Sequence, residues 1–534
     1  MNAPLKIFSA FLLGASLTGQ AASATLPESV RDALRRANIP LSSVGIVVQQ
    51  TDARTPLLSL NADQAMNPAS TIKLLTTFAS LETLGPAYQW KTEAYLDGKL
   101  ENGVLQGNLV FKGYGDPKLT IEQFWLWLRE MRQRGLREIR GDIVLDRSFF
   151  EPASHDPAEF DNDPTRAYNV GPNALLLNFN ALRLRLTPDA AGTGTAQTSA
   201  MLEPNLSGYL VSNRITTSAI KPCSGGDTYK ARLEERSIVL EGTIPVDCGE
   251  VEDYFSLLPH SDYFFAVFSS LWNEMGGTLQ GGLREGSAPA EQAAFSTHHS
   301  PPLSEVIRDI NKFSNNTMAR QLFLTLGTAA HASKIAPAAP DAETETPGGA
   351  VIPVNGIPPP DTLPSGNPGA GSDPPAAPAR STPVGAPPLR DDPPAASIER
   401  STEAVRQWLN KQQLHFPELV LENGAGLSRK ERISPQHLAE LLKHATHSPF
   451  AAELEASLPI LGMDGSVKKR LKDSEAAGYA HLKTGTLEGV KSIAGYVKAQ
   501  SGKQWIAVFI INHPNAAAGQ GAQDALIDWL QKKH

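Results

Sequence analysis

The spacing of apolar residues predicts helices and strands on both sides of a long middle region. Apolar residues recur every three or four positions in some segments, which is typical of amphipathic helices, and form short continuous runs in others, which favours buried strands. Helical spacing occurs at residues 28–37, 303–310, 318–326, 435–445 and 522–530. Strand-like runs occur at residues 44–50, 57–60, 492–497 and 505–511.

The middle region, residues 93–284, has a different pattern of apolar and polar residues. Short runs of alternating apolar and polar residues, such as 108–113 and 181–186, are separated by Gly, Asn, Asp and Pro. Alternation with a period of two is the signature of half-buried strands. This stretch therefore predicts a strand-rich accessory region.

A third pattern occupies residues 331–396. The segment contains 17 of the 41 prolines of the chain and no aromatic residue. Such a composition buries too little apolar surface to offset the entropy of ordering. We therefore expect a disordered, Pro/Ala-rich insertion that acts as a spacer; contact with peptidoglycan or a partner through this segment is the alternative.

The first 24 residues predict a secretory signal peptide. Lys6 precedes the apolar run 7–15, and residues 22–24 match the A-x-A cleavage pattern. A buried first helix is the alternative. No later segment reaches 18 consecutive apolar residues, so no transmembrane segment is expected in the mature chain. The net charge of −8 gives no reason to expect nucleic-acid binding.

The two cysteines of the chain, Cys223 and Cys248, lie 25 residues apart in the strand-rich region. In an exported protein such a pair is expected to form a disulfide, which would stabilise the fold by about 3 kcal/mol. Two buried free thiols are the alternative. The sequence contains no metal-ligand cluster, so neither a metal nor a cofactor is expected.

Ser70 and Lys73 form an S-x-x-K pair at the start of an apolar, helix-like run. A serine needs a base to become a nucleophile, and a lysine serves only when its amine is neutral. Residues three apart share one face of a helix, which puts Lys73 within reach. The pattern recurs at 218–221 and 466–469, but the first lacks a helix and the second lies in a solvated cationic stretch. Ser70 is therefore the best candidate nucleophile.

Two further motifs follow in order along the chain. Ser314 and Asn316 form S-x-N between helical runs, and K-T-G occurs once, at 483–485, before a strand-like run. S-x-N alone is weak because it also occurs at 59–61 and 365–367. The order S-x-x-K, S-x-N, K-T-G is the signature of penicillin-recognising serine acyl-enzymes.

With these motifs the chain resembles the class C low-molecular-mass penicillin-binding proteins, a family of D-alanyl-D-alanine carboxypeptidases and endopeptidases. Other family-like stretches are residues 113–117, 141–146, 168–172, 422–429 and 462–466. The 243 residues between Ser70 and Ser314 also fit, because the family carries accessory domains there.

The resemblance implies an α/β (α+β) fold. Residues 25–92 and 285–534 would form a transpeptidase-like domain, an antiparallel sheet flanked by helices. Residues 93–284 would be an inserted accessory region with two β-rich subdomains. The insertion at 331–396 departs from the family pattern and is expected to loop out without disturbing the site.

The resemblance also implies roles for the first two motifs. Ser70 would attack the carbonyl of the D-Ala residue on the amino side of the scissile bond, with Lys73 as the base. Ser314, supported by Asn316 and Lys73, would then relay a proton to the leaving amine.

The third motif would bind the substrate. Lys483 would supply positive potential, and Thr484 and Thr486, on either side of Gly485, would hydrogen-bond a substrate carboxylate. The backbone N–H groups of Ser70 and Thr486 would form the oxyanion hole.

Four more residues align with positions at which members of the family line the substrate groove. Asp163 or Glu488 would complement the amine of a diaminopimelate side chain, and Arg429 its carboxylate; Tyr168 lies in the same family-like stretch as Asp163. A surface or fold-stabilising role is the alternative for each of the four.

Together these features predict an exported, periplasmic serine DD-peptidase. It would cleave D-Ala-D-Ala termini and D-Ala–diaminopimelate cross-links in peptidoglycan stem peptides, and β-lactam antibiotics would acylate it. A β-lactamase would need a carboxylate to activate the deacylating water, and none is evident. A catalytically silent scaffold that binds peptidoglycan would not need Ser70, Lys73 and Lys483 together.

Overall fold

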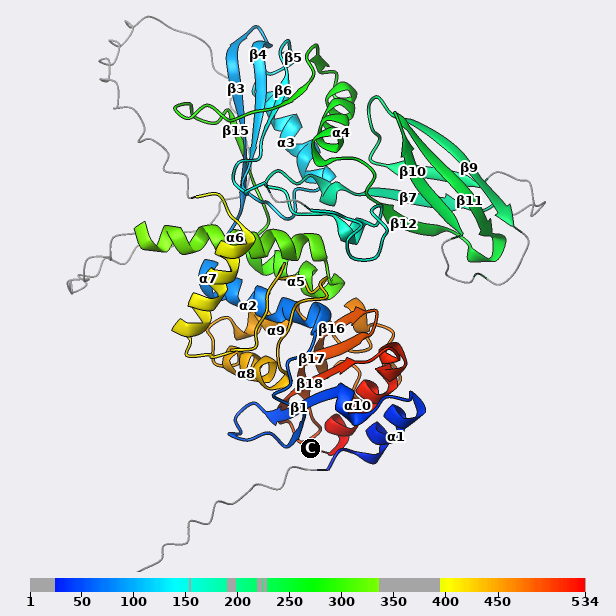
Figure 1. Cartoon of the computed structure of the whole chain (residues 1–534). Helices are drawn as coiled ribbons and strands as arrows, with labels where there is room; N and C mark the ends of the chain where they lie inside the picture. Colours follow the sequence, from blue (N-terminus) through cyan, green and yellow to red (C-terminus); the bar gives the residue numbers. More distant parts are fainter. Residues whose placement is uncertain are drawn as a thin grey trace, which may run out of the picture.

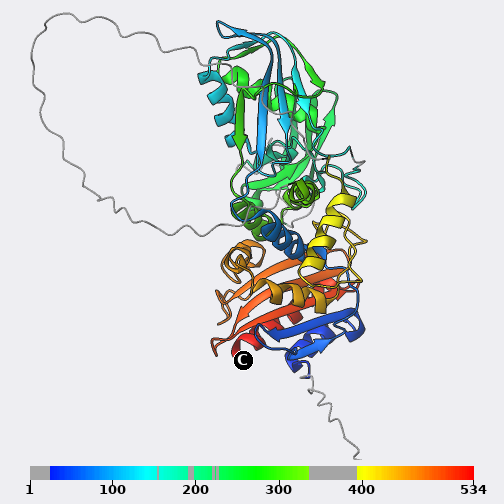
Figure 2. The same ribbon diagram turned by 90° about the vertical axis from the view of Figure 1, so that its left-hand side faces the viewer.

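The computed structural model describes residues 25–152, 155–189, 198–218, 223, 228–335 and 394–533. They form two bodies stacked end on end, with a β-rich lobe that extends sideways from the upper body (Figures 1 and 2). The predicted signal peptide, residues 1–24, lies outside the described residues. Within the described part of the chain, no helix is both long enough and apolar enough to cross a membrane.

The lower body is built on a five-stranded antiparallel sheet in the order β16-β17-β18-β1-β2. Val47 lies opposite Val508 in the register, and Lys483 lies opposite Ala494. Strands from the two ends of the chain are therefore neighbours, and β16 is an edge strand. The bounds are β1 (Val44–Gln50), β2 (Leu58–Leu60), β16 (Ala480–Leu487), β17 (Val490–Lys498) and β18 (Gln504–Asn512).

Helices cover both faces of this sheet (Figure 1). Alternate residues of a strand point to opposite faces of the sheet. Ile46 and Val48 therefore pack in the hydrophobic core that includes α1 and α10, whereas Val47 packs in the hydrophobic core on the other face. The antiparallel sheet flanked by helices is confirmed. The helices are α1 (Glu28–Arg36), α2 (Lys73–Leu84), α5 (Leu303–Phe313), α6 (Asn316–Ile335), α7 (Ile398–Lys411), α8 (Pro435–Ala445), α9 (Ala451–Ser457) and α10 (Gln520–Lys533).

The upper body contains a seven-stranded sheet against which α3 (Ile121–Gln133) and α4 (His260–Glu274) pack. Their contact is aromatic: the Phe111 ring lies 5.5 Å from Trp127 and 5.2 Å from Phe264. The strands are β3 (Lys91–Glu101), β4 (Val104–Gly113), β5 (Glu138–Ile139), β6 (Ile143–Asp146), β13 (Thr278–Leu279), β14 (Leu283–Glu285) and β15 (Ser296–His299).

The side lobe consists of two three-stranded sheets, β10-β11-β9 and β12-β7-β8. Its apolar residues belong to the same core cluster as those of the upper body. Cys223 and Cys248 form the predicted disulfide in this lobe. The strands are β7 (Leu182–Thr187), β8 (Ser199–Glu203), β9 (Leu210–Ser218), β10 (Tyr229–Glu234), β11 (Ser237–Pro245) and β12 (Val251–Phe255).

Two boundaries differ from those expected from the sequence. β15 pairs with β3, so the accessory sheet continues to His299, beyond residue 284. The pattern missed β15 because its sequence, Ser-Thr-His-His, has no apolar alternation. The bounds of the insertion expected at residues 331–396 also differ. The helix α6 continues to Ile335, and Ala396 is buried and pairs with Phe150. Residues 336–393 of the predicted insertion lie outside the described residues.

Candidate active site

Ser70 lies in a short 3₁₀ turn, η2 (Ala69–Ile72), which leads directly into α2. The sequence predicted Ser70 in the first turn of the α-helix itself, whereas the α-helix begins only at Lys73. Asn67 fixes the entry to this turn, because its Oδ1 accepts from Ala69 N at 2.9 Å and its Nδ2 donates to Ser428 O at 2.9 Å.

The K-T-G strand β16 lies directly against this turn. A Cβ atom on Gly485 would lie 2.8 Å from Ser70 N, 2.8 Å from Pro68 O and 2.3 Å from Ser492 Oγ. Only glycine permits this approach. The glycine of the motif therefore sets the distance between the turn that carries Ser70 and β16.

Lys73 joins the first two motifs. Its Nζ lies 3.0 Å from Ser70 Oγ and 2.7 Å from Asn316 Oδ1, and it also donates to Ala425 O. Burial lowers the pKa of Lys73 well below its usual value, and the positive charge of Lys483 lowers it further. The surroundings thus favour the neutral amine that a general base requires.

Ser314 caps the C-terminus of α5 in a left-handed conformation, with φ of 55°. Lys483 Nζ donates to Ser314 Oγ at 2.9 Å and to Thr484 O at 2.7 Å. The sequence predicted support for Ser314 from Lys73 and Asn316, whereas its hydrogen bond here is to Lys483. Burial lowers the pKa of Lys483 to about 7.

The two threonines of the third motif have separate partners. Thr484 Oγ1 shares a hydrogen bond of 2.7 Å with Ser466 Oγ. Thr486 Oγ1 accepts from Lys491 Nζ at 3.2 Å. Ser466 therefore lies beside the K-T-G motif, whereas the serine that contacts Lys73 is Ser70.

The turn at residues 422–426 belongs to one of the family-like stretches of the sequence, but its contacts with α2 were not predicted. Gly424 O accepts from Thr76 Oγ1 at 2.7 Å, and Ala425 O accepts from Lys73. A Cβ on Gly426, whose φ is 81°, would lie 2.2 Å from Ala69 O. The glycines flanking Ala425 were the available signal that this turn lies close to another main chain.

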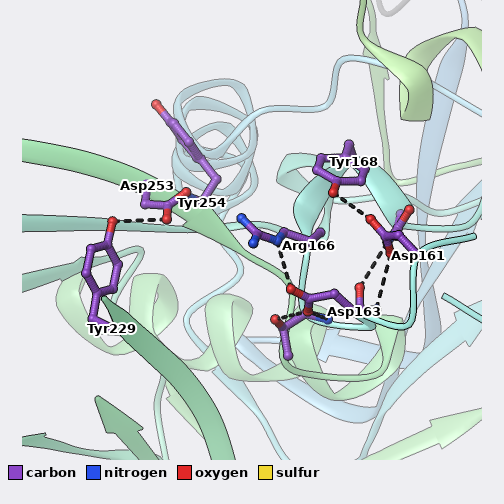
Figure 3. Close-up of polar contacts among 9 residues, drawn as sticks. Asp161, Asp163, Arg166, Tyr168, Tyr229, Asp253 and Tyr254 are labelled. Atoms are coloured by element: carbon purple, nitrogen blue, oxygen red, sulfur yellow. Dashed lines mark hydrogen bonds and ion pairs between the residues drawn. The ribbon is translucent and has the colours of Figure 1, made fainter. Parts of the chain in front are cut away.

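Asp163 and Tyr168 lie in a loop held by its own acidic residues (Figure 3). Asp163 Oδ2 accepts from Arg166 Nε at 2.8 Å, and Asp163 Oδ1 accepts from Thr165 Oγ1 at 2.6 Å. Tyr168, which is exposed, donates its hydroxyl to Asp161 at 2.6 Å. Asp163 thus has protein partners here.

The same loop is joined to the side lobe and to α6. Ser256 N donates to Thr165 O at 2.8 Å, next to a bridge between Arg166 and Phe255 at the end of β12. Arg320 of α6 donates to Val170 O at 2.7 Å. The accessory region and the catalytic helices therefore fix this loop together.

Arg429 and Glu488, predicted to bind opposite groups of a ligand, instead pair with each other. Arg429 Nη1 donates to Glu488 O at 2.8 Å, and Nη2 lies 3.3 Å from Glu488 Oε2. The guanidinium also lies 4.8 Å from the centre of the Phe160 ring. Arg429 therefore connects the end of β16 to the loop that carries Asp163 and Tyr168.

A cavity of about 550 Å³ lies beside these residues. It has charged, amide and aromatic side chains in its wall, among them Phe160, Arg320, Asn423, Arg429 and Lys430. No group of three or more His, Cys, Asp or Glu side chains within the described ranges is placed to hold a metal ion.

The model of the D-Ala-D-Ala carboxypeptidase 3 (S13) family matches residues 26–347 and 391–533. The chain belongs to this family. The resemblance drawn from three short motifs is thereby confirmed, and membership of S13 makes the protein a serine-type D-Ala-D-Ala carboxypeptidase.

Relatives of this S13 protein resemble it over most of its length. It is 22% identical over 473 residues to D-alanyl-D-alanine carboxypeptidase DacB of Haemophilus influenzae, covering 88% of this chain and 85% of that one. It is 25% identical over 508 residues to the D-alanyl-D-alanine carboxypeptidase of Actinomadura sp. strain R39, covering 90% and 80%. The crystal structure of penicillin-binding protein 4 from H. influenzae has a TM-score of 0.68 at 21% identity, over 93% of this chain and 99% of that one, so the fold is shared.

Proposed function

We propose that this S13 protein is exported to the periplasm and hydrolyses both D-Ala-D-Ala termini and D-Ala–diaminopimelate cross-links of peptidoglycan. Both reactions would proceed through a Ser70 acyl-enzyme, and penicillins would acylate the same serine. The observation that carries the proposal is the set of acceptors around the Lys73 amine.

A neutral lysine amine has two N–H groups and one lone pair. Asn316 Oδ1 and Ala425 O accept hydrogen bonds and have no proton to donate, so they occupy the two N–H groups. The lone pair is left for the Ser70 hydroxyl, 3.0 Å away. Ser70 therefore loses its proton to Lys73 as its Oγ forms the bond to the substrate carbonyl.

When Lys73 takes this proton, its amine becomes positively charged within a buried site. Ser314, hydrogen-bonded to Lys483, then relays that proton: it gives its hydroxyl proton to the leaving amine and takes the proton that Lys73 received from Ser70, which restores the neutral Lys73 amine. The leaving amine is D-Ala in a peptide terminus and the diaminopimelate side chain in a cross-link. Because both leaving groups are amines, the same residues serve both reactions, and water then releases the acyl group from Ser70.

The close approach of β16 to the nucleophile supports an oxyanion hole made by the N–H groups of Ser70 and Thr486. Gly485 lies between Thr484 and Thr486, and a Cβ atom on it would lie 2.8 Å from Ser70 N. A donor of this kind contributes about 3–4 kcal/mol to the transition state of comparable enzymes.

The substrate class rests on the polar residues beside the site. Glu488 is 91% exposed at its side chain, so its ion pair with Arg429 is weak and open to competition from a substrate carboxylate. Asp163 and Tyr168 lie in the loop that contacts Arg429 through Phe160. A diaminopimelate side chain, with one amine and one carboxylate, fits this combination.

The test uses residues 25–534 and the Ser70→Ala variant. Each is incubated with cross-linked muropeptide dimers and with pentapeptide monomers, and the products are identified by mass. Cleavage of both by the wild type alone supports the proposal. Loss of only the terminal D-Ala would limit the activity to the carboxypeptidase, and no cleavage would favour the silent scaffold. Rapid turnover of a penicillin would instead indicate a β-lactamase.

A further inference from the structure

A buried carboxylate lies behind Lys73 and has no part in the mechanism above. Glu431 is fully buried, and its Oε1 accepts from three successive backbone N–H groups, at 3.3 Å from Glu422, 3.1 Å from Asn423 and 3.0 Å from Gly424. Its Oε2 has no hydrogen-bond partner within the part of the chain that the structure describes.

We propose that Glu431 is a positioning residue for the acylation step: it fixes the turn that presents the Ala425 carbonyl to Lys73, and its negative charge stabilises the protonated amine formed when Ser70 attacks. The inference rests on the proposed function of Lys73 as the base, and it adds a residue to that function.

The positioning is visible in the contacts of the turn. Three N–H groups that converge on one oxygen hold the backbone of residues 422–424 in a single conformation. The next carbonyls along the chain, those of Gly424 and Ala425, accept from Thr76 and Lys73 of α2. Glu431 therefore sets, through the turn, one of the two acceptors that orient the Lys73 amine.

The charge of Glu431 opposes the other charges around Lys73. Lys483 on β16 and Arg320 on α6 are positive and lower the pKa of Lys73, whereas Glu431 raises it. Burial also lowers the pKa of Arg320 to about 10, with Glu431 and Glu422 acting in the opposite direction. Burial raises the pKa of Glu431 itself, whereas its three backbone hydrogen bonds and the charge of Lys73 lower that pKa. As an anion, Glu431 opposes the effect of Lys483 and Arg320 on Lys73.

This balance determines how well Lys73 accepts a proton. With burial and two neighbouring cations alone, the amine would be neutral over a wide range of pH but would be a poor proton acceptor. A fixed carboxylate makes the protonated amine more stable without contacting the substrate. The efficiency of a general base depends on such a match between its pKa and the working pH.

The test compares Glu431→Gln with Glu431→Asp in the full mature chain. Glutamine retains an oxygen for the three N–H groups and removes the charge; aspartate retains the charge and shortens the reach. The rate of acylation by a fluorescent penicillin is measured across pH, with Glu403→Gln, an exposed substitution on α7, as the control. Thermal unfolding is measured for each protein.

Acylation requires neutral Lys73, so its rate falls as the pH drops through the pKa of that amine. In Glu431→Gln we expect this acid limb to move down by about one pH unit, while Glu431→Asp and Glu403→Gln keep the wild-type limb. An unchanged limb in Glu431→Gln, or an equal shift in Glu431→Asp, would overturn the proposal and leave Glu431 a purely structural residue.

A second readout does not depend on activity. In protein labelled with ¹³C-lysine, the Cε signal of Lys73, assigned with Lys73→Arg, is titrated in the wild type and in Glu431→Gln. A lower pKa in the variant supports the coupling, and an equal pKa refutes it. If the wild type were not acylated at all, the proposed function would fail, whereas this titration would still decide the role of Glu431.

Discussion

Replacing Gly485 by alanine tests whether the approach of β16 positions the nucleophile. The new Cβ would lie 2.8 Å from both Ser70 N and Pro68 O. Ordinary contact begins near 3.4 Å, so the turn that carries Ser70 would have to retreat by about 0.6 Å. The Cβ would also lie 2.3 Å from Ser492 Oγ, which donates to Pro68 O at 2.6 Å. The substitution therefore displaces the main chain of the nucleophile and removes a hydrogen bond that anchors it.

A misplacement of about 1 Å can cost about 100-fold in a reaction that depends on near-attack geometry. On the same scale a retreat of about 0.6 Å costs about 15-fold in rate, or about 1.6 kcal/mol of activation free energy. The assay is the second-order rate of acylation by a fluorescent penicillin, with circular dichroism to confirm folding. Gly521→Ala on α10 is the matched control, because a Cβ there meets no atom within 4 Å. Acylation of folded Gly485→Ala within threefold of the wild type would refute the reasoning.

Two further predictions concern pH. Burial lowers the pKa of Lys483 to about 7, so its positive charge is lost as the pH rises through that value. The KM for a pentapeptide should therefore rise above about pH 7. The variant Lys483→Gln should have a high KM at every pH. Burial raises the pKa of Asp116 from 3.8 to about 7, so folding becomes less favourable as the pH rises across that interval. Asp116→Asn should therefore gain about 4 kcal/mol in the free energy of unfolding over the wild type at pH 8 and little at pH 4, as measured by denaturant melts; an equal gain at both values would contradict the linkage.

The motifs were predictable because each one is local. Ser70 and Lys73 are three residues apart, and a helical turn of any sequence puts such a pair on one face. The strands and helices around them have strong apolar periodicity, as at α8, whose bounds match the predicted range. That the three motifs belong to one site was inferred from their order along the chain, because no single motif carries that information.

The remaining contacts could not be predicted because they depend on main-chain atoms brought together from distant segments. Ala425 O lies 352 positions from Lys73 in the sequence, and any residue type carries a carbonyl. Glu431 looks like a surface charge between Lys430 and Arg432, and only the fold shows that it is buried. Likewise, Arg429 and Glu488 were predicted to bind oppositely charged groups of a ligand, whereas the fold places the two side chains in contact with each other.

The pairing of β1 with β18 has a consequence for the order in which the protein is completed. Val47 and Val508 are neighbours in the sheet although one belongs to the first strand and the other to the last. A chain that emerges from its N-terminus onward can assemble the accessory sheets, which are continuous from β3 to β15, before β18 exists. The sheet beside Ser70 closes only when the final strand arrives. Activity therefore requires residues 504–512, and a truncation before residue 504 would leave the accessory region without a working site.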